Sequence, residues 1–370
     1  MINRRSLLQI AAGGAAVGAF GLRPAYADMP KLKEKDTYKI GFAQTESNNP
    51  WRLQQTKSMQ DEAKKRGWQL VYTDAAGSAA KQVADVRSMI AQKVDVILLA
   101  PREERPLIPA VMEAKKAGIP LFLIDRGVDP SLAKGGEDYV AFIGSDFVEE
   151  GRLAAEALVK AVDGKAKIIE LVGTVGSSPA NDRAKGFADY IKDHPGMEVI
   201  ASQSGDFARD KGRQVFETLY QAHPEATALY SHNDEMTMGA IAAMEAAGKV
   251  PGKDLIIASI DGTKDAAQAL QDGKVVVVVE CNPNFGPAAF DAVVKYGKGE
   301  AIEPRLVNKD RVFTRAPLAA PAVSASTFPC DSRRLPGGGC RQLRDSPPWP
   351  PQNHFCRCRA STSHSAISRP

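Results

Sequence analysis

The 370-residue sequence contains little cysteine, histidine or aromatic residue. It has five cysteines, five histidines and 6% aromatic residues. Four of the cysteines lie after residue 329, so Cys281 is the single cysteine of the main body. A lone cysteine cannot form a disulfide within that body, and the spacing of the others fits no zinc motif. We therefore exclude a fold organised by disulfides or by a His/Cys metal site.

Long apolar runs are also missing. After residue 27 there is no stretch of about 18 consecutive apolar residues, so we expect no transmembrane helix. Residues 1–27 begin with a charged segment containing Arg4-Arg5, continue with a short apolar run, and end at Ala25-Tyr26-Ala27. This is the pattern of an export signal that is removed from the mature protein. The arginine pair favours twin-arginine export, with the general secretory route as the alternative.

The formal net charge of +4 comes from the two ends of the chain. Residues 1–27 carry three arginines and no acid, and residues 315–370 carry eight arginines and two aspartates. Taking +3 and +6 from the total of +4 leaves −5 for residues 28–314. A net negative body argues against nucleic acid or an anionic membrane as the partner.

From residue 38 onward, short apolar runs alternate with amphipathic stretches. The runs are rich in Val, Ile and Leu, which is typical of strands buried on both faces. We expect strands at Tyr38–Ala43, Gln69–Tyr72, Val94–Ala100, Pro120–Ile124, Val140–Gly144, Ile168–Val172, Val199–Gln203, Ala228–Tyr230, Leu255–Ile260 and Val275–Val279. We expect helices at Pro50–Arg66, Ala79–Gln92, Phe147–Val162, Pro179–Asp193, Asp210–Ala222, Met236–Ala247 and Phe285–Tyr296. This alternation predicts parallel sheets with right-handed helical crossovers.

The number of strands favours two lobes over one. Two sheets of five or six strands are more typical than a single sheet of ten. We therefore predict two similar, doubly wound α/β lobes joined by a hinge, the first at 28–144 and the second at 145–261. Residues 262–314 are expected to be shared between the lobes, with crossings near Ser145, Asp261 and Pro283.

Residues 315–370 differ in composition from the rest. They contain nine prolines and no lysine, and Pro347-Pro348-Trp349-Pro350-Pro351 is incompatible with a helix or a central strand. One interpretation is a disordered tail. The other, which the abrupt change favours, is out-of-frame translation of the end of the gene.

Polar residues follow the apolar runs, where the predicted strands end. In open parallel sheets, ligands bind at the carboxyl ends of the strands. These residues combine carboxylates, amides and guanidinium groups with two aromatic rings. A neutral ligand with several hydroxyls needs this mixture, because each buried hydroxyl must be hydrogen-bonded. The candidates are Ser47, Trp51, Arg52, Asp125, Arg126, Arg183, Phe207, Asn233, Asp261 and Glu280.

Each candidate also has a purely structural interpretation. The adjacent carboxylate and guanidinium after the fourth run can form a local ion pair, and the two aromatic candidates can be core residues. In the pair Asn233-Asp234, we expect Asp234 to cap the following helix and Asn233 to bind ligand. Asp261 can cap the next helix. His232 is expected to be a surface or packing residue.

Several stretches together point to a known family. They are Pro50-Trp51-Arg52, Ile124-Asp125-Arg126, Asp182-Arg183-Ala184-Lys185-Gly186-Phe187, Gly205-Asp206-Phe207, His232-Asn233-Asp234-Glu235-Met236 and Ser259-Ile260-Asp261-Gly262. With these stretches in this order and spacing, residues 38–313 resemble the periplasmic sugar-binding proteins of the ribose/galactose type. The sequence departs from the family at Phe147, where an asparagine is expected, and throughout residues 315–370.

The resemblance implies the periplasmic binding protein type I fold, with a sugar bound between two hinged lobes by the candidates other than Ser47. It implies a periplasmic, non-enzymatic protein without a cofactor. Such a protein captures a monosaccharide, such as galactofuranose or a related pentose or hexose. It delivers the sugar to the permease subunits of an ABC-type importer at the inner membrane. We expect a monomer.

Three rival functions have different sequence requirements. An α/β enzyme acting on a sugar would need catalytic residues, and the sequence has neither a phosphate-binding glycine motif nor a G-x-S-x-G elbow. A repressor effector domain would need an N-terminal DNA-binding domain, where this chain has an export signal. A sugar-sensing chemoreceptor adaptor can coexist with import and stays open.

Overall fold

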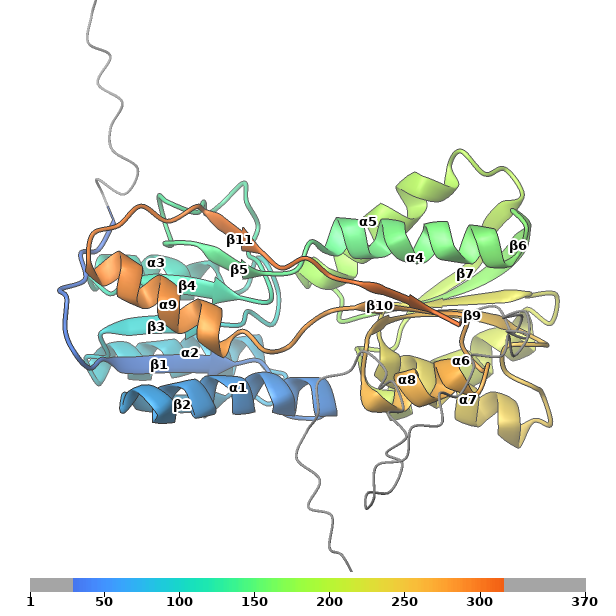
Figure 1. Cartoon of the computed structure of the whole chain (residues 1–370), viewed down its shortest axis with the longest axis horizontal. Helices are drawn as coiled ribbons and strands as arrows, with labels where there is room; N and C mark the ends of the chain where they lie inside the picture. The colour runs from blue at the N-terminus through green and yellow to red at the C-terminus, as the bar shows by residue number, and fades with distance from the viewer. Residues whose placement is uncertain (1–28, 316–370) are drawn as a thin grey trace, which may run out of the picture. The chain divides into compact units, whose positions relative to one another are not determined.

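The computed structural model describes residues 29–315, which form two α/β lobes (Figure 1). The predicted export signal at 1–27 and the tail after Arg315 lie outside the described residues. Each lobe is built on a six-stranded sheet. Among residues 29–315, no helix is both long enough and apolar enough to cross a membrane.

The first sheet has the strand order β11-β5-β4-β3-β1-β2, and every pair is parallel. Its strands β3 and β4 are completely buried, as expected for a sheet covered by helices on both faces. The strands are β1 (Lys39–Gln44), β2 (Gln69–Asp74), β3 (Val96–Leu99), β4 (Leu121–Ile124), β5 (Phe142–Gly144) and β11 (Arg305–Val307).

The second sheet repeats this arrangement with the order β12-β10-β9-β8-β6-β7. All pairs are parallel except β10 with β12, which is antiparallel. The strands are β6 (Ala166–Val172), β7 (Met197–Ser204), β8 (Ala228–Ser231), β9 (Ile256–Asp261), β10 (Val277–Glu280) and β12 (Val312–Thr314).

Helices cover both faces of each sheet, so the predicted fold class is confirmed (Figure 1). In the first lobe α1 packs against α9, and α2 packs against α3. In the second lobe α4 packs against α5, and α7 contacts both α6 and α8. The helices are α1 (Pro50–Arg66), α2 (Ala79–Ala91), α3 (Ile108–Lys116), α4 (Phe147–Ala161), α5 (Ser178–Ile191), α6 (Arg209–Ala222), α7 (Asp234–Ala246), α8 (Lys264–Gln271) and α9 (Gly286–Gly297).

Local signals in the sequence fix the ends of the first helix. The side chain of Asn49 caps α1 by accepting a hydrogen bond from the backbone N–H of Arg52. Pro50 follows at the first helical position, where its missing N–H costs nothing. Gly67 ends the helix in the left-handed conformation (φ 67°) that glycine adopts without strain. Together these signals place the start of α1 at the carboxyl end of β1.

The chain passes between the two sheets three times. The first crossing, Ser145-Asp146, joins β5 to α4, and the second, Cys281–Phe285, joins β10 to α9. The third, Asn308–Arg311, joins β11 to β12. The crossing expected near Asp261 is wrong, because β9, α8 and β10 all belong to the second lobe.

Candidate ligand-binding site

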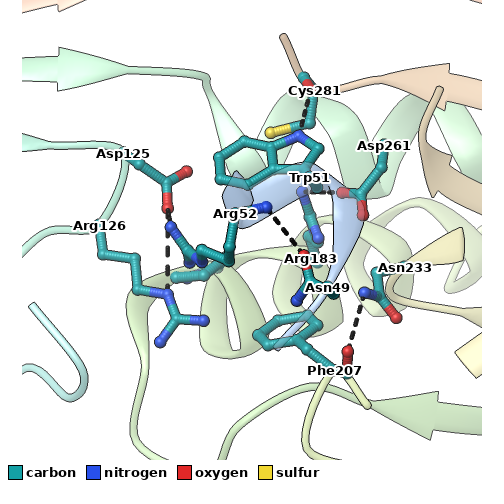
Figure 2. A pocket seen from close by; sticks show the side chains of 11 residues that line it. Asn49, Trp51, Arg52, Asp125, Arg126, Arg183, Phe207, Asn233, Asp261 and Cys281 are labelled. Atoms are coloured by element: carbon teal, nitrogen blue, oxygen red, sulfur yellow. Dashed lines mark hydrogen bonds and ion pairs between the residues drawn. The ribbon is translucent and has the colours of Figure 1, made fainter. Parts of the chain in front are cut away.

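A pocket between the lobes is lined by residues from the carboxyl ends of strands in both sheets (Figure 2). Counting the part that opens to solvent, it holds about 340 Å³ of empty space. The lining residues are Asn49, Trp51, Arg52, Asp125, Arg126, Pro179, Arg183, Phe207, Asn233, Asp261 and Cys281.

Asp125 and Arg52 form the core of the first-lobe wall. Asp125 follows β4 directly and adopts a left-handed backbone conformation with φ 65°. Its Oδ2 lies 2.7 Å from Nη1 of Arg52, which also donates to Gln55 at 2.9 Å. Both members of the ion pair are almost completely buried. Because Gln55 and Asp125 hold one end of the Arg52 guanidinium, its orientation in the pocket is fixed.

Arg126 is the largest fully buried side chain among residues 29–315 and has few partners for its charge. Its Nη1 donates to the backbone carbonyl of Arg102 at 3.1 Å, and its Nη2 lies 3.6 Å from Oε1 of Glu46. Within the described residues its Nε makes no hydrogen bond. Burial, with help from the nearby charge of Arg52, lowers the pKa of Arg126 to about 9. A buried arginine with unused donors at a pocket wall is suited to bind acceptor oxygens.

Arg183 has the corresponding place on the second-lobe wall. Its Nε donates to Glu150 at 2.7 Å, its Nη1 donates to the carbonyl of His232 at 2.5 Å, and its Nη2 lies 3.6 Å from Asp261. Glu150 is fully buried on α4, and burial raises its pKa to about 7 although Arg183 opposes the shift. Glu150 does not line the pocket, so its contribution is to orient the guanidinium that does.

Asp261 is held in an unusual conformation at the end of β9. Its φ of 131° falls in a region that residues other than glycine rarely adopt, which is a form of strain found most often at functional sites. Burial raises the pKa of its carboxyl well above the ordinary value, and the neighbouring Asp234 and Glu150 add to the shift. Asp261 therefore offers the pocket a carboxyl with few compensating partners.

Two aromatic rings complete the pocket and lie on opposite sides of its polar groups in Figure 2. The indole of Trp51 donates from Nε1 to the carbonyl of Cys281 at 2.6 Å, which ties α1 to the second crossing. The ring of Phe207 lies 5.4 Å from the guanidinium carbon of Arg126 and 5.8 Å from that of Arg183. Gly173 makes room for this ring, since a Cβ there would lie 1.9 Å from it.

The helix cap expected at Asp234 is wrong. Asn233 caps α7 by accepting from the backbone N–H of Met236 at 3.0 Å, and its amide donates to the carbonyl of Phe207 at 3.2 Å. Asp234 instead accepts from the hydroxyl of Ser259 and from two backbone N–H groups after β9. Asn233 still lines the pocket, so a single side chain caps the helix and forms part of the wall.

Two of the ten sequence candidates do not line the pocket. The hydroxyl of Ser47 lies 2.8 Å from that of Tyr72 on β2. Glu280 forms a bidentate ion pair with Arg311 of the third crossing, whose Nε and Nη2 lie 2.7 and 2.8 Å from the two carboxylate oxygens. Ser47 thus supports the first loop, and Glu280 joins β10 to the segment that leads into β12.

Three residues of the lining were not among the candidates. Asn49 had a signal, because an asparagine before proline and an apolar helix is a typical cap. Pro179 on α5 and Cys281 in the second crossing had none, since neither residue type indicates sugar binding. His232, expected at the surface or in packing, is fully buried, and its Nε2 lies 3.1 Å from Glu170.

The pocket combines donors, acceptors and apolar faces. Guanidinium groups supply donors, carboxylates and an amide supply acceptors, and the opposite charges nearly balance. This suits a neutral ligand with several hydroxyls, because charge-assisted hydrogen bonds are roughly twice as strong as neutral ones. Among residues 29–315, no group of histidine, cysteine or acidic side chains is arranged to hold a metal ion.

Comparison with known proteins agrees with this chemistry. Residues 40–301 match the family described as periplasmic binding protein domain. The chain is 42% identical to the galactofuranose-binding protein YtfQ of Escherichia coli (strain K12), over 72% of this chain and 84% of that protein. It is 34% identical to the ribose import binding protein RbsB of Bacillus subtilis (strain 168), over 74% and 87% of the two chains.

A solved structure extends the comparison to a bound ligand. The periplasmic binding protein component of the arabinose ABC transporter from Shewanella sp. ANA-3 was solved with α- and β-L-arabinofuranose bound. It is 39% identical in sequence, with a TM-score of 0.71, and the match covers 75% of this chain and 92% of that one.

Proposed function

The chain belongs to the periplasmic binding protein family, and on that premise we propose that it captures a monosaccharide in its furanose form and delivers it to an ABC-type importer. The observation that carries the proposal is the pocket between the lobes, where eight of the ten sequence candidates meet. They come from segments far apart in the chain, and only the two lobes together bring them into one wall (Figure 2).

The arrangement of the pocket supports a bound sugar ring. Trp51 and Phe207 supply apolar surfaces for the faces of a ring. Asp125, Arg126 and Asn233 supply charged or amide groups for its hydroxyls. Because buried hydroxyls must be hydrogen-bonded, a sugar with one hydroxyl missing or inverted would leave a wall group unpaired and bind more weakly.

The furanose form is supported by two of the relatives. The names of the YtfQ protein and of the arabinose-transporter structure both specify a furanose. Both relatives share about 40% of their residues with this chain over most of its described length. The ribose-binding relative is less similar, at 34% identity.

The remaining parts of the proposal concern export, oligomeric state and the division into lobes. We propose that residues 1–27 direct export to the periplasm, and that the mature protein is a monomer that binds sugar without converting it. We propose lobes at 28–144 and 145–261 that share residues 262–314. The three crossings then act as the hinge, which is where such proteins absorb the motion of closure.

Calorimetric titration of the purified protein with neutral pentoses and hexoses tests the proposal. We expect tight binding of one or a few sugars that form furanoses, and weak binding of sugars locked as methyl pyranosides. Recovery of the unchanged sugar after long incubation would agree with a binding protein, whereas a new product would show an enzyme. Failure to bind any sugar of the panel would contradict the proposal.

A further inference from the structure

A cluster of contacts beside the pocket joins the two lobes through residues that do not line the pocket. Arg102 follows β3 in the first lobe, and its Nη2 lies 2.8 and 3.1 Å from the two carboxylate oxygens of Asp206 in the second lobe. Beside this pair, the backbone N–H of Glu104 donates to the carbonyl of Gly176 at 2.8 Å. The side chain of Glu104 also accepts from Asn181 at 2.7 Å.

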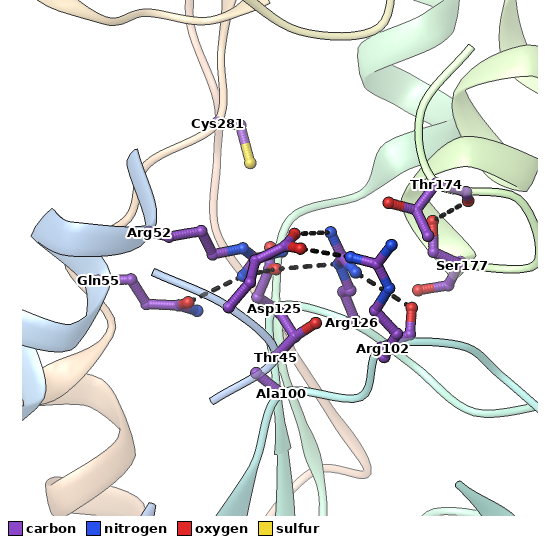
Figure 3. A network of polar contacts seen from close by, with 12 residues as sticks. Thr45, Arg52, Gln55, Ala100, Arg102, Asp125, Arg126, Thr174, Ser177 and Cys281 are labelled. Carbon is purple, nitrogen blue, oxygen red and sulfur yellow. Dashed lines mark hydrogen bonds and ion pairs between the residues drawn. The ribbon is translucent and has the colours of Figure 1, made fainter. Parts of the chain in front are cut away.

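Arg102 also contacts the groups that hold Arg126 in the pocket. Its backbone carbonyl accepts from Nη1 of Arg126 at 3.1 Å, and its Nη1 donates to Glu46. The other carboxylate oxygen of Glu46 faces Nη2 of Arg126 at 3.6 Å. Figure 3 shows Arg102 beside Arg126 and Asp125, with Thr174 and Ser177 of the second lobe beyond it.

On the opposite side, the partner of Arg102 is adjacent to a pocket residue. Asp206 and Phe207 are consecutive residues with left-handed backbone conformations, φ 56° and 57°. Two such residues in a row hold the turn after β7 in one shape, because few alternatives are open to side chains other than glycine. Fixing Asp206 therefore also fixes the position of Phe207, whose ring lies against Arg126.

From these contacts we propose that Arg102 is a positioning residue that couples closure of the two lobes to the sugar pocket. The contact of its Nη2 with both carboxylate oxygens of Asp206 forms when the lobes close, holds Phe207 against Arg126, and so slows release of the sugar. Neither Arg102 nor Asp206 lines the pocket, so the proposed effect needs no contact between either residue and the sugar. The inference rests on the proposed function, because it concerns the release of the ligand named there.

The exposure of the Arg102–Asp206 ion pair determines how much it can slow sugar release. The side chain of Arg102 is buried, but that of Asp206 is 48% exposed, so solvent screens the attraction. Exposed and partly exposed ion pairs contribute about 0.2–1 kcal/mol in double-mutant cycles. The upper part of that range, about 0.4–1 kcal/mol, corresponds to a change of roughly twofold to fivefold in the rate of sugar release. Raising the salt concentration should weaken sugar binding by the unmodified protein in the same way.

The test is the Asp206→Asn variant of the full chain, measured by stopped-flow fluorescence with the sugar that binds tightest in calorimetry. Asparagine has the same shape as aspartate and tolerates the left-handed backbone. We expect sugar release to be about twofold to fivefold faster, with an unchanged association rate and an unchanged melting temperature without sugar. The control is Asp189→Asn, which removes a carboxylate of the same lobe whose ion pairs stay within α5 and its end.

The Arg102→Met variant and the double variant complete the design. Arg102→Met should speed release more than Asp206→Asn, because it also removes a partner of Glu46. Adding Asp206→Asn to Arg102→Met should then leave the rate of sugar release the same as in Arg102→Met alone. The coupling role is wrong if Asp206→Asn releases sugar at the same rate as Asp189→Asn. It is also wrong if adding Asp206→Asn to Arg102→Met speeds sugar release as much as Asp206→Asn does alone. Loss of sugar binding by the unmodified protein would instead overturn the proposed function.

Discussion

Replacing Arg126 by methionine should abolish tight sugar binding while leaving the protein folded. Two hydrogen bonds from the Arg126 guanidinium to a bound sugar would be lost. Hydrogen bonds from a charged group contribute about 1.5–3 kcal/mol each. A loss near 3 kcal/mol corresponds to a dissociation constant raised roughly a hundredfold or more.

The same substitution should have little effect on the stability of the sugar-free protein. Burial of Arg126 lowers its pKa to about 9, which shows that the folded protein disfavours the charge at this position. Glu46 keeps its ion pair with Arg102, and methionine fills much of the volume of the arginine side chain. Replacement of a buried charge by an apolar residue of similar size is often neutral or stabilising. The melting temperature without sugar should therefore be equal to that of the unmodified protein or higher.

Calorimetry and thermal melts, each with and without sugar, measure these two outcomes separately. The matched control is Arg87→Met, which removes an exposed arginine of the same lobe that pairs with Glu113. The control should bind sugar normally. If folded Arg126→Met binds sugar within threefold of the unmodified protein, then this pocket is not the sugar site.

Three further substitutions test other parts of the account. Trp51→Phe removes the 2.6 Å hydrogen bond to the Cys281 carbonyl but keeps a ring. We expect the free energy of unfolding in urea titrations to fall by about 1–3 kcal/mol, the cost of an unpaired buried carbonyl, and an unchanged value would argue against this bond. Gly173→Ala places a methyl group 1.9 Å from the Phe207 ring and should weaken binding at least about tenfold by displacing the ring, a prediction that fails if the ring stays in place in a crystal structure of the variant. Burial raises the pKa of Asp310 in the third crossing to about 6, so its contribution to stability is present below pH 4 and lost as the pH rises through 6. In urea titrations between pH 4 and 6, the free energy of unfolding of Asp310→Asn should therefore decline less than that of the unmodified protein. Identical declines would contradict this assignment.

The sequence predicted the interior of the fold better than its edges. Runs such as Val94–Ala100 are apolar because the strand inside them is buried on both faces, and all ten expected strands are present. The edge strands Arg305–Val307 and Val312–Thr314 have only three residues each and are largely exposed, so no apolar run indicates them. The helices Ile108–Lys116 and Lys264–Gln271 were not expected, because with nine and eight residues they are too short for a clear helical pattern of apolar residues.

The sequence predicted which residues lie near the site better than it predicted where their side chains point. Arg126 and Asn233 could be found because strand ends meet at one edge of a parallel sheet, and the resemblance to known sugar-binding proteins assigned their places. What sequence cannot supply is the direction of a side chain within a loop. Glu280 ends its strand as expected, but Arg311, 31 residues later, forms an ion pair with its carboxylate outside the pocket lining.

Carbon-13 NMR of galactose labelled at the anomeric carbon, with the unmodified protein present, tests the central claim most directly. Furanose and pyranose forms have separate anomeric signals, so the spectrum reports which form is bound. The account predicts a bound signal from the furanose form that disappears in Arg126→Met. A bound signal from the pyranose form, or a furanose signal that persists unchanged in that variant, would contradict it.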